Sequence, residues 1–238
     1  MHAQTRSGAV AAEIARFDAL ADQWWDPNGP MKPLHRMNPV RIGWIDTRLR
    51  ARFGAGGVRI LDVGCGAGLV AETLAGRGHD VLGVDAAAEA LQAGRAHAEG
   101  KGLALAYREG VAEDLLAEPE RFAAITALEV IEHVADPAAF VATLAALLQP
   151  GGLLFLSTLN RTPRAYVTAK LGAEYLLRWL PVGTHDWKKF VTPAEMGGYA
   201  RAAGLRMADV AGMTPDLGRG GWKTGRDLAV NYIAMAEK

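Results

Sequence analysis

The stretch Ile60-Leu61-Asp62-Val63-Gly64-Cys65-Gly66-Ala67-Gly68 decides the fold of this chain. An apolar run, residues 58–63, ends in three glycines at alternate positions, and a helix-like segment, residues 69–74, follows. This pattern is typical of a strand that turns tightly into a helix, because glycine allows positive φ and has no Cβ to obstruct a ligand. The free N–H groups at the start of such a helix favour a ligand above the turn.

A second apolar run, residues 81–84, ends in Asp85. A carboxylate at the end of a second strand can accept hydrogen bonds from both hydroxyls of a ribose. The glycine turn and Asp85 together therefore predict a nucleotide-containing ligand, with a glycine turn that binds nothing as the alternative. A dinucleotide fingerprint would need its third glycine at position 69, where this chain has Leu69.

The spacing Asp62-x-Gly64-x-Gly66-x-Gly68 resembles motif I of the class I S-adenosylmethionine-dependent methyltransferases. In that family the glycines face the amino-acid half of the cofactor, and the acid after the second strand holds the ribose. The resemblance implies S-adenosyl-L-methionine as the cofactor, bound by Gly64, Gly66, Gly68 and Asp85.

The composition limits the class of protein. Lys plus Arg equals Asp plus Glu at 26 each, so we expect no partnership with nucleic acid. The single cysteine, Cys65, excludes an intrachain disulfide and a cysteine zinc cluster. No apolar run approaches the ~20 residues that span a bilayer, and residues 1–10 lack a signal-peptide core. We therefore expect a cytoplasmic protein.

Apolar runs alternate with helix-like segments along most of the chain, which indicates parallel strands joined by right-handed crossovers. We predict strands at 58–63, 80–84, 103–108, 121–128, 152–158, 205–213 and 227–236, and helices at 68–77, 86–100, 112–118, 137–148 and 193–203. A Gly-rich, basic loop, 214–225, joins the last two strands. The expected fold class is α/β: a Rossmann-like class I methyltransferase with a seven-stranded, mostly parallel sheet, helices on both faces and an antiparallel last strand.

Two segments fall outside this alternation. Helices predicted at 8–25 and 38–52 form an N-terminal helical cap, 1–55, which acts as a lid on the methyltransferase domain, 56–238. An insertion after strand five, 159–192, interrupts the domain. Trp24 and Trp25 in the cap either close the cofactor pocket or belong to an ordinary core.

A second group of polar residues follows the fourth strand. Glu129, Glu132 and His133 are spaced i, i+3, i+4, so a turn of helix would put all three on one face. They could hold a divalent cation or supply a general base. Mg²⁺ prefers an all-oxygen shell, so His133 fits it imperfectly. The alternative is a turn that closes over the cofactor without a metal.

Several linear motifs narrow the resemblance to the ubiquinone-biosynthesis O-methyltransferases, which the chain resembles from about residue 17 to its end. These are Trp24-Trp25-Asp26, Pro33-Leu34-His35, Asn38-Pro39-Val40-Arg41, the run 129–137 and the run 183–190. The resemblance implies methylation of phenol or catechol hydroxyls on polyprenylated benzene rings, and other ubiquinone-biosynthesis proteins as partners. It also implies cofactor contacts from Arg41, Gly64, Asp85 and Leu128, and, from its eukaryotic branch, a divalent metal such as Mg²⁺ on Glu129, Glu132 and His133.

The implied reaction has an energetic requirement. A phenol with a pKa near 10 is ionised to about one part in a thousand at pH 7, so forming the phenolate costs about 4 kcal/mol. A cation on Glu129, Glu132 and His133 could offset this cost, or His133 or His185 could act as a base. His185 lies in the insertion, where hydrogen bonding to Asp186 is the alternative role.

The insertion also carries a predicted helix, 164–180, with a wide apolar face and an excess of basic residues. Such a helix is typical of contact with an anionic lipid surface, here the inner face of the membrane, and the alternative is a lid helix packed on the domain. Three other functions stay open: methylation of a different small molecule, a non-catalytic cofactor- or lipid-binding protein, and an NAD-dependent dehydrogenase, which Leu69 and Asp62 disfavour.

Overall fold

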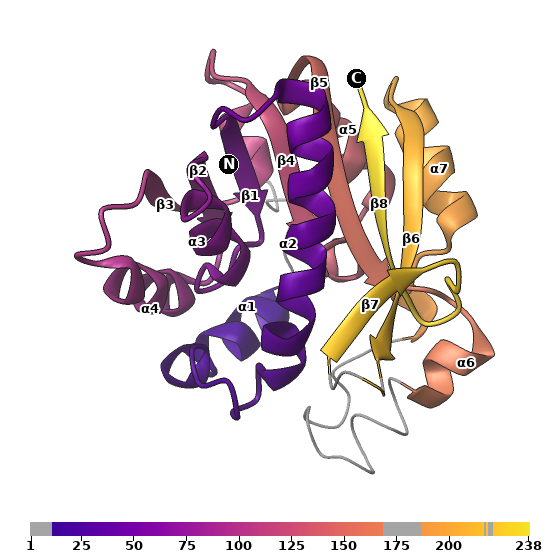
Figure 1. The fold of residues 1–238 in the computed structure, drawn as a ribbon, viewed down its shortest axis with the longest axis horizontal. Helices are drawn as coiled ribbons and strands as arrows, with labels where there is room; N and C mark the ends of the chain where they lie inside the picture. Colours follow the sequence, from indigo (N-terminus) through magenta and orange to yellow (C-terminus); the bar gives the residue numbers. More distant parts are fainter. Residues whose placement is uncertain (1–10, 169–186, 217, 219–220) are drawn as a thin grey trace, which may run out of the picture.

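A computed structural model describes residues 11–168, 187–216, 218 and 221–238. Within them one sheet has the strand order β3-β2-β1-β4-β5-β8-β6-β7 (Figure 1). The strands are β1 Arg59–Val63, β2 Asp80–Asp85, β3 Leu105–Glu109, β4 Phe122–Leu128, β5 Leu148–Leu159, β6 Arg206–Asp216, β7 Gly221–Gly225 and β8 Asn231–Glu237. The first five strands pair in parallel, and β8 runs antiparallel to both β5 and β6.

One strand was not predicted. The segment expected to be a loop contributes β7, which pairs antiparallel with the end of β6, so the described sheet has eight strands and not seven. Trp222 of β7 packs against a core cluster that includes residues of a long N-terminal helix. This burial favours an ordered hairpin in a segment whose glycines and basic residues alone indicated a loop.

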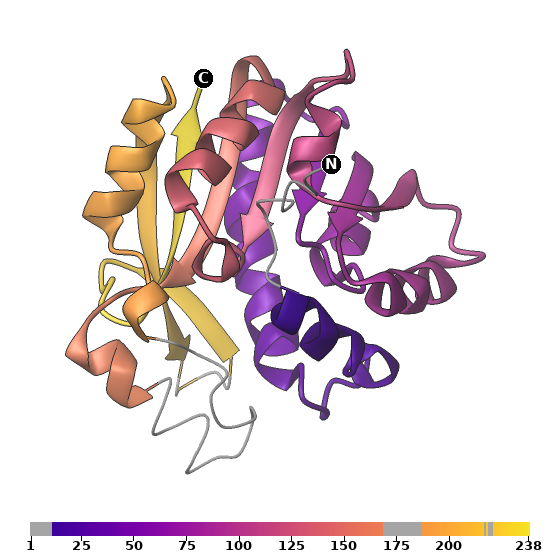
Figure 2. The same cartoon turned by 180° about the vertical axis from the view of Figure 1, so that it is seen from behind.

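Helices cover both faces of the sheet. The helices α2 Lys32–Phe53 and α3 Leu69–Ala75 lie on one face (Figure 1), and α5 Pro137–Leu147 and α7 Pro193–Ala202 lie on the other (Figure 2). The helix α4 Ala88–Ala98 packs against β3, and α6 Pro163–Ala165 follows β5. The short 3-10 turns are η1 Ala21–Gln23, η2 Ala112–Leu115, η3 Ile131–His133 and η5 Trp187–Lys189. None of the helices in the described ranges has the length and apolar composition needed to cross a membrane.

The N-terminal helices differ from the predicted ones. The helix α1 Ala11–Asp18 ends before Trp24, and η1 follows it, so a continuous helix over 8–25 is wrong. The helix α2 begins before its predicted start and includes Pro39 in its interior. Proline cannot donate a backbone hydrogen bond in the helix. The residue before it, Asn38, is buried, and its Nδ2 donates to the Leu69 carbonyl at 2.8 Å. The division into a cap and a domain at residue 55 stays a prediction.

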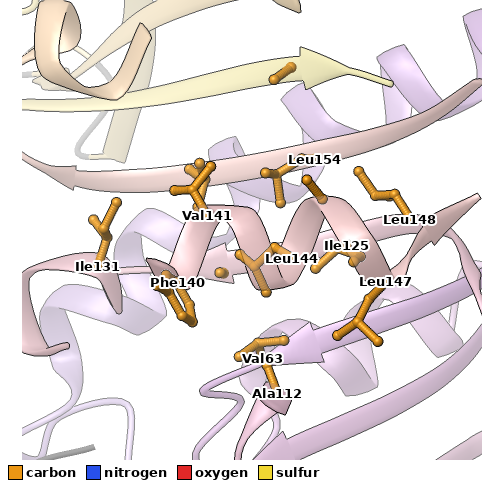
Figure 3. Close-up of a cluster of buried hydrophobic side chains, with 14 of the residues drawn as sticks. Val63, Ala112, Ile125, Ile131, Phe140, Val141, Leu144, Leu147, Leu148 and Leu154 are labelled. Carbon is orange, nitrogen blue, oxygen red and sulfur yellow. The ribbon is translucent and has the colours of Figure 1, made fainter. Parts of the chain in front are cut away.

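The side chains of β1 pack against the helices on both faces of the sheet. Leu61 and Val63 pack into the core beneath α5, whereas Ile60 packs toward α2 and α3. Figure 3 shows this first core, with Val141 and Leu144 of α5 and Ile125 of β4 among its side chains. Because this burial fixes the register, the carboxyl ends of β1, β2 and β4 meet at one edge of the sheet, where an open α/β sheet binds its ligand.

Candidate functional site

The glycine turn after β1 has the predicted form. Gly64, Gly66 and Gly68 all have positive φ, at 66°, 53° and 88°. The N–H groups of Gly64 and Cys65 both donate to the Val84 carbonyl, at 2.8 and 3.2 Å, which ties the turn to β2. The helix α3 starts directly after Gly68. The strand, turn and helix therefore occur where the spacing predicted them.

Side chains of the same chain pack closely on this turn. A Cβ on Gly64 would lie 2.5 Å from a methyl carbon of Val130, and one on Gly66 would lie 2.1 Å from the ring of Trp24. A Cβ on Gly68 would lie 1.8 Å from the hydroxyl of Tyr107. All three distances are shorter than a Cβ contact allows, so the packing of neighbouring side chains on the turn favours glycine at each position.

A pocket of about 240 Å³ opens above this edge of the sheet. It brings together seven of the predicted site residues, namely Gly64, Gly66, Asp85, Leu128, Glu129, Glu132 and His133. Gly68 and Arg41 are not among the lining residues. The remaining wall is largely apolar and comes from the N-terminal segment, η2 and α5, as expected of a small-molecule site.

Asp85 is oriented by backbone donors. One of its carboxylate oxygens accepts from the Gly66 N–H at 2.7 Å, and the other accepts from the Ala87 N–H at 2.8 Å. Burial raises the pKa of Asp85, and these two hydrogen bonds oppose the shift. Each carboxylate oxygen can accept a further hydrogen bond, so the group retains the capacity to bind a diol.

Asp62 and Arg41 are both buried and interact electrostatically. Asp62 Oδ1 accepts from the Thr126 hydroxyl at 2.7 Å, while Oδ2 is buried and has no hydrogen-bond partner among the described residues. Burial raises the pKa of Asp62 to about 7, an effect that Arg41 opposes. Arg41 is 2% exposed, and its Nη1 lies 3.9 Å from Glu129 Oε1. Burial lowers the pKa of Arg41, and Glu129 opposes this shift.

The predicted helical turn at Glu129 is wrong. Glu129 has φ +59° and lies between the end of β4 and η3, so it shares no helical face with Glu132 and His133. Its carboxylate accepts from the Ser157 hydroxyl at 2.7 Å and from Asn231 Nδ2 at 3.2 and 3.3 Å. At the end of β4 the Glu129 carboxylate thus meets donors on β5 and β8.

Glu132 has a separate environment. It is 4% exposed, and its Oε2 accepts from the Thr158 hydroxyl at 2.9 Å. No group of three or more His, Cys, Asp or Glu side chains in the described ranges is arranged to hold a metal. In this arrangement the Glu129 carboxylate accepts hydrogen bonds from β5 and β8, and the Glu132 carboxylate accepts one from β5.

His133 is the predicted catalytic residue that the structure describes. It lines the pocket, and the ring of Phe17 meets it edge-on with centroids 5.8 Å apart. The other predicted base, His185, lies outside the described residues, as does most of the helix predicted over 164–180.

Sequence reasoning did not identify the side chains that hold the acids. Thr126, Ser157, Thr158 and Asn231 are all buried, and each donates to one of the carboxylates. The available signal was weak: three hydroxyl residues interrupt otherwise apolar strands, and an amide opens the last strand. Partners for buried polar groups are expected, but their identity depends on the strand register.

Known proteins match this chain over most of its length. The methyltransferase domain family matches residues 33–210. A ubiquinone biosynthesis O-methyltransferase from Azorhizobium caulinodans is 47% identical over 234 residues, which cover 95% of this chain and 92% of that protein. The chain belongs to the ubiquinone biosynthesis O-methyltransferases. A second member of this family, from Parvibaculum lavamentivorans, is 45% identical over 241 residues and covers 98% of this chain and 95% of its own length.

Solved structures agree with the assignment of the fold. Magnesium protoporphyrin IX methyltransferase from Synechocystis PCC 6803, with bound SAH, superposes with a TM-score of 0.66 at 19% identity, covering 95% of this chain and 99% of its own. The predicted class I methyltransferase fold and the predicted O-methyltransferase family are confirmed. As a member of this family the chain is an enzyme that transfers methyl groups, and the NAD-dependent dehydrogenase alternative is wrong.

Gly66→Ala tests the close packing on the turn. We expect it to lower the free energy of unfolding by at least about 1 kcal/mol, because alanine is strained at this φ and its methyl group would displace Trp24. Urea unfolding measures the change. Gly198→Ala in α7 is the matched control, since its added Cβ would meet nothing within 4 Å. Equal stability of the Gly66 variant and the wild type would contradict the prediction.

The raised pKa of Asp62 predicts that the stability of the fold depends on pH. This pKa rises from 3.8 to about 7 on folding, so between these values the folded chain keeps a proton that the unfolded chain has lost. The free energy of unfolding should fall with rising pH, by up to about 1.4 kcal/mol per unit between about pH 5 and 7, and level off above. Asp62→Asn should remove this component in urea titrations across that range. Parallel pH profiles for the variant and the wild type would show that another group is responsible.

Proposed function

We propose that this enzyme binds S-adenosyl-L-methionine in the pocket above β1, β2 and β4 and methylates a phenol or catechol hydroxyl of a polyprenylated benzene ring. The observation that carries the proposal is the meeting of the glycine turn, Asp85 and His133 in one pocket. The solved magnesium protoporphyrin IX methyltransferase, whose fold is similar, holds SAH or SAM. The cofactor supplies a methyl group activated on a sulfonium sulfur.

The cofactor contacts follow from the chemistry of the lining. Asp85 would accept from the ribose hydroxyls, and Leu128, 9% exposed at the end of β4, would give an apolar wall. Gly64 and Gly66 would face the amino-acid half, and Gly68 would support the turn at the start of α3. Arg41 would pair with the carboxylate of that half. Its Nη1 lies 3.9 Å from Glu129 Oε1, so the Glu129 side chain would share the charge of Arg41 with the ligand.

The acceptor needs a base beside the pocket. His133 lines the pocket next to the buried Glu132, and Phe17 restrains its ring from one side. A histidine in this position can accept the phenolic proton as the methyl group is transferred, which offsets part of the roughly 4 kcal/mol needed to form a phenolate at pH 7. His185 stays the alternative base. The apolar lining from Ile14, Phe17 and Leu20 suits an aromatic ring with a hydrocarbon tail.

The base of the insertion offers a surface for a lipid-soluble substrate. Tyr166 and Val167, just before the segment 169–186 in the sequence, are large apolar residues with exposed fractions of 39% and 53%. Lys188 and Lys189, just after this segment in the sequence, are exposed. Trp187 Nε1 donates to the Thr162 carbonyl at 3.2 Å, which links the residues before the segment to those after it. We propose that this apolar and basic surface contacts anionic lipid at the inner face of the membrane from the cytoplasm, and that other ubiquinone-biosynthesis proteins are partners.

His133→Ala tests the catalytic assignment. We expect it to lower kcat by about 10²- to 10⁴-fold, the usual contribution of a positioned base. The assay follows transfer of a radiolabelled methyl group to a short-chain catechol analogue, with calorimetry against S-adenosylhomocysteine to verify cofactor binding. His185→Ala is the parallel variant. A large loss there, with none at His133, would assign the base to the insertion, and no transfer by the wild type would contradict the proposed substrate class.

The divalent cation on Glu129, Glu132 and His133 stays a prediction. If a metal is required, dialysis against EDTA should abolish methyl transfer, and Mg²⁺ or another divalent cation should restore it. Glu132→Ala should then show no gain from added cation. Activity that survives both EDTA and Glu132→Ala would contradict the metal and leave the activation of the acceptor to a side chain.

Vesicle flotation tests the lipid surface. We expect the wild type to float with vesicles rich in anionic lipid and to bind neutral vesicles weakly, because each basic residue near such a surface contributes about 1 kcal/mol. Reversing the charges in Lys188→Glu/Lys189→Glu should reduce flotation. Arg206→Glu on β6, which also reverses an exposed cation but lies outside the insertion, is the control. Equal binding to neutral vesicles would contradict the proposal.

A further inference from the structure

Aromatic side chains of the N-terminal segment cross the candidate pocket. The ring of Trp24 lies on Gly66 in the space where a Cβ would be, and Trp24 is 6% exposed. Phe17 contacts Trp24 with ring centroids 6.0 Å apart, and it contacts His133 at 5.8 Å. All of these residues line the pocket. A ligand in this pocket would therefore contact Trp24 and Phe17.

The neighbour of Trp24 ties this segment to the domain. Trp25 stacks on the imidazole of His97 in α4, with ring centroids 3.5 Å apart and an interplanar angle of 12°. His35 meets Trp25 edge-on at 6.2 Å, and its Nε2 lies 2.8 Å from the Trp24 carbonyl oxygen. Lys101 Nζ lies 5.7 Å from the centre of the Trp25 ring. The stacked ring of His97 is thus the closest aromatic contact between Trp25 and the domain.

The imidazole of His97 is itself held in place. Its Nδ1 lies 2.7 Å from Glu72 Oε2 of α3, and Lys101 Nζ donates to the other Glu72 oxygen at 2.7 Å. The Glu72 side chain is mostly buried, at 13% exposure, so it offers a fixed anchor. Glu72 of α3 therefore fixes the orientation of the His97 ring of α4, against which Trp25 stacks.

The packing of Trp25 against the domain also leaves one polar group without a hydrogen bond in the described part of the chain. The indole N–H of Trp25 is buried and has no hydrogen-bond partner among the described residues. A buried donor without an acceptor disfavours the state that contains it, because the same group binds water when exposed. The stacked contact with His97 opposes this tendency to open.

We propose that His97 is a positioning residue for cofactor binding, which acts through Trp25 to hold Trp24 over the glycine turn. This inference rests on the proposed function of the pocket as the site of S-adenosyl-L-methionine. Glu72 orients His97, and the stacked pair keeps the N-terminal segment closed while a ligand is bound. Loss of the stack opens the segment more often, so the cofactor and its product leave faster.

Stopped-flow release and calorimetry of S-adenosylhomocysteine from the full chain test this inference. His97→Ala should raise the dissociation rate and Kd by about 3- to 10-fold, the change expected from losing one aromatic pair. His97→Phe keeps a stacking ring and should stay within about 2-fold of the wild type. In turnover, KM for the cofactor should rise in His97→Ala while kcat at saturating cofactor is retained. Gln92→Ala, an exposed position on the same helix, is the control.

Each outcome separates this inference from the proposed function. If the wild type binds S-adenosylhomocysteine and His97→Ala releases it at the wild-type rate, the positioning role is overturned. If the wild type binds none, the proposed cofactor site is wrong. Trp25→Leu removes the stack from the other side and should repeat the effect, so it carries the test if His97→Ala does not fold. Equal losses in His97→Phe and His97→Ala would also overturn the role of stacking.

Discussion

The close packing of other side chains on the glycine turn is the constraint on which the rest of this structure depends. Val130, Trp24 and Tyr107 each occupy the space that a Cβ would need, at three successive glycines. These side chains come from the segment after β4, from the N-terminal segment and from β3. The turn therefore joins three distant parts of the chain, and a pocket forms where these parts meet above the sheet edge.

Four buried or half-buried acids lie near this turn, and hydrogen-bond donors hold each of them. Asp85 accepts backbone N–H groups, whereas Asp62, Glu129 and Glu132 accept mainly from side chains on β4, β5 and β8. A buried carboxylate is costly unless donors satisfy it. Hydrogen bonding thus lets several acids lie close to one apolar pocket, and it leaves Arg41 as the cation that faces both Asp62 and Glu129.

Local patterns predicted much of this molecule. The order of strands and helices, the glycine turn and the acid at Asp85 follow from periodicities within a few residues of each other. Pairings across the sheet could not be predicted in the same way, because Ser157 and Asn231 lie 28 and 102 residues from the Glu129 that they hold. The strand β7 was missed for a related reason: Trp222 is stabilised by packing on a core that includes α2, and the sequence around it carries loop residues.

The backbone at Glu129 limits which residues can replace it. Its left-handed conformation is adopted readily by glycine, asparagine and aspartate, and only at a cost by longer side chains. Ser157 and Asn231, however, meet a carboxylate at the end of a glutamate side chain. The preferred backbone and the required reach therefore select different amino acids. A residue that suits the backbone would lose the hydrogen bonds to Ser157 and Asn231, whereas a long side chain that keeps them strains the backbone. Backbone geometry as well as charge therefore limits which amino acids this position accepts.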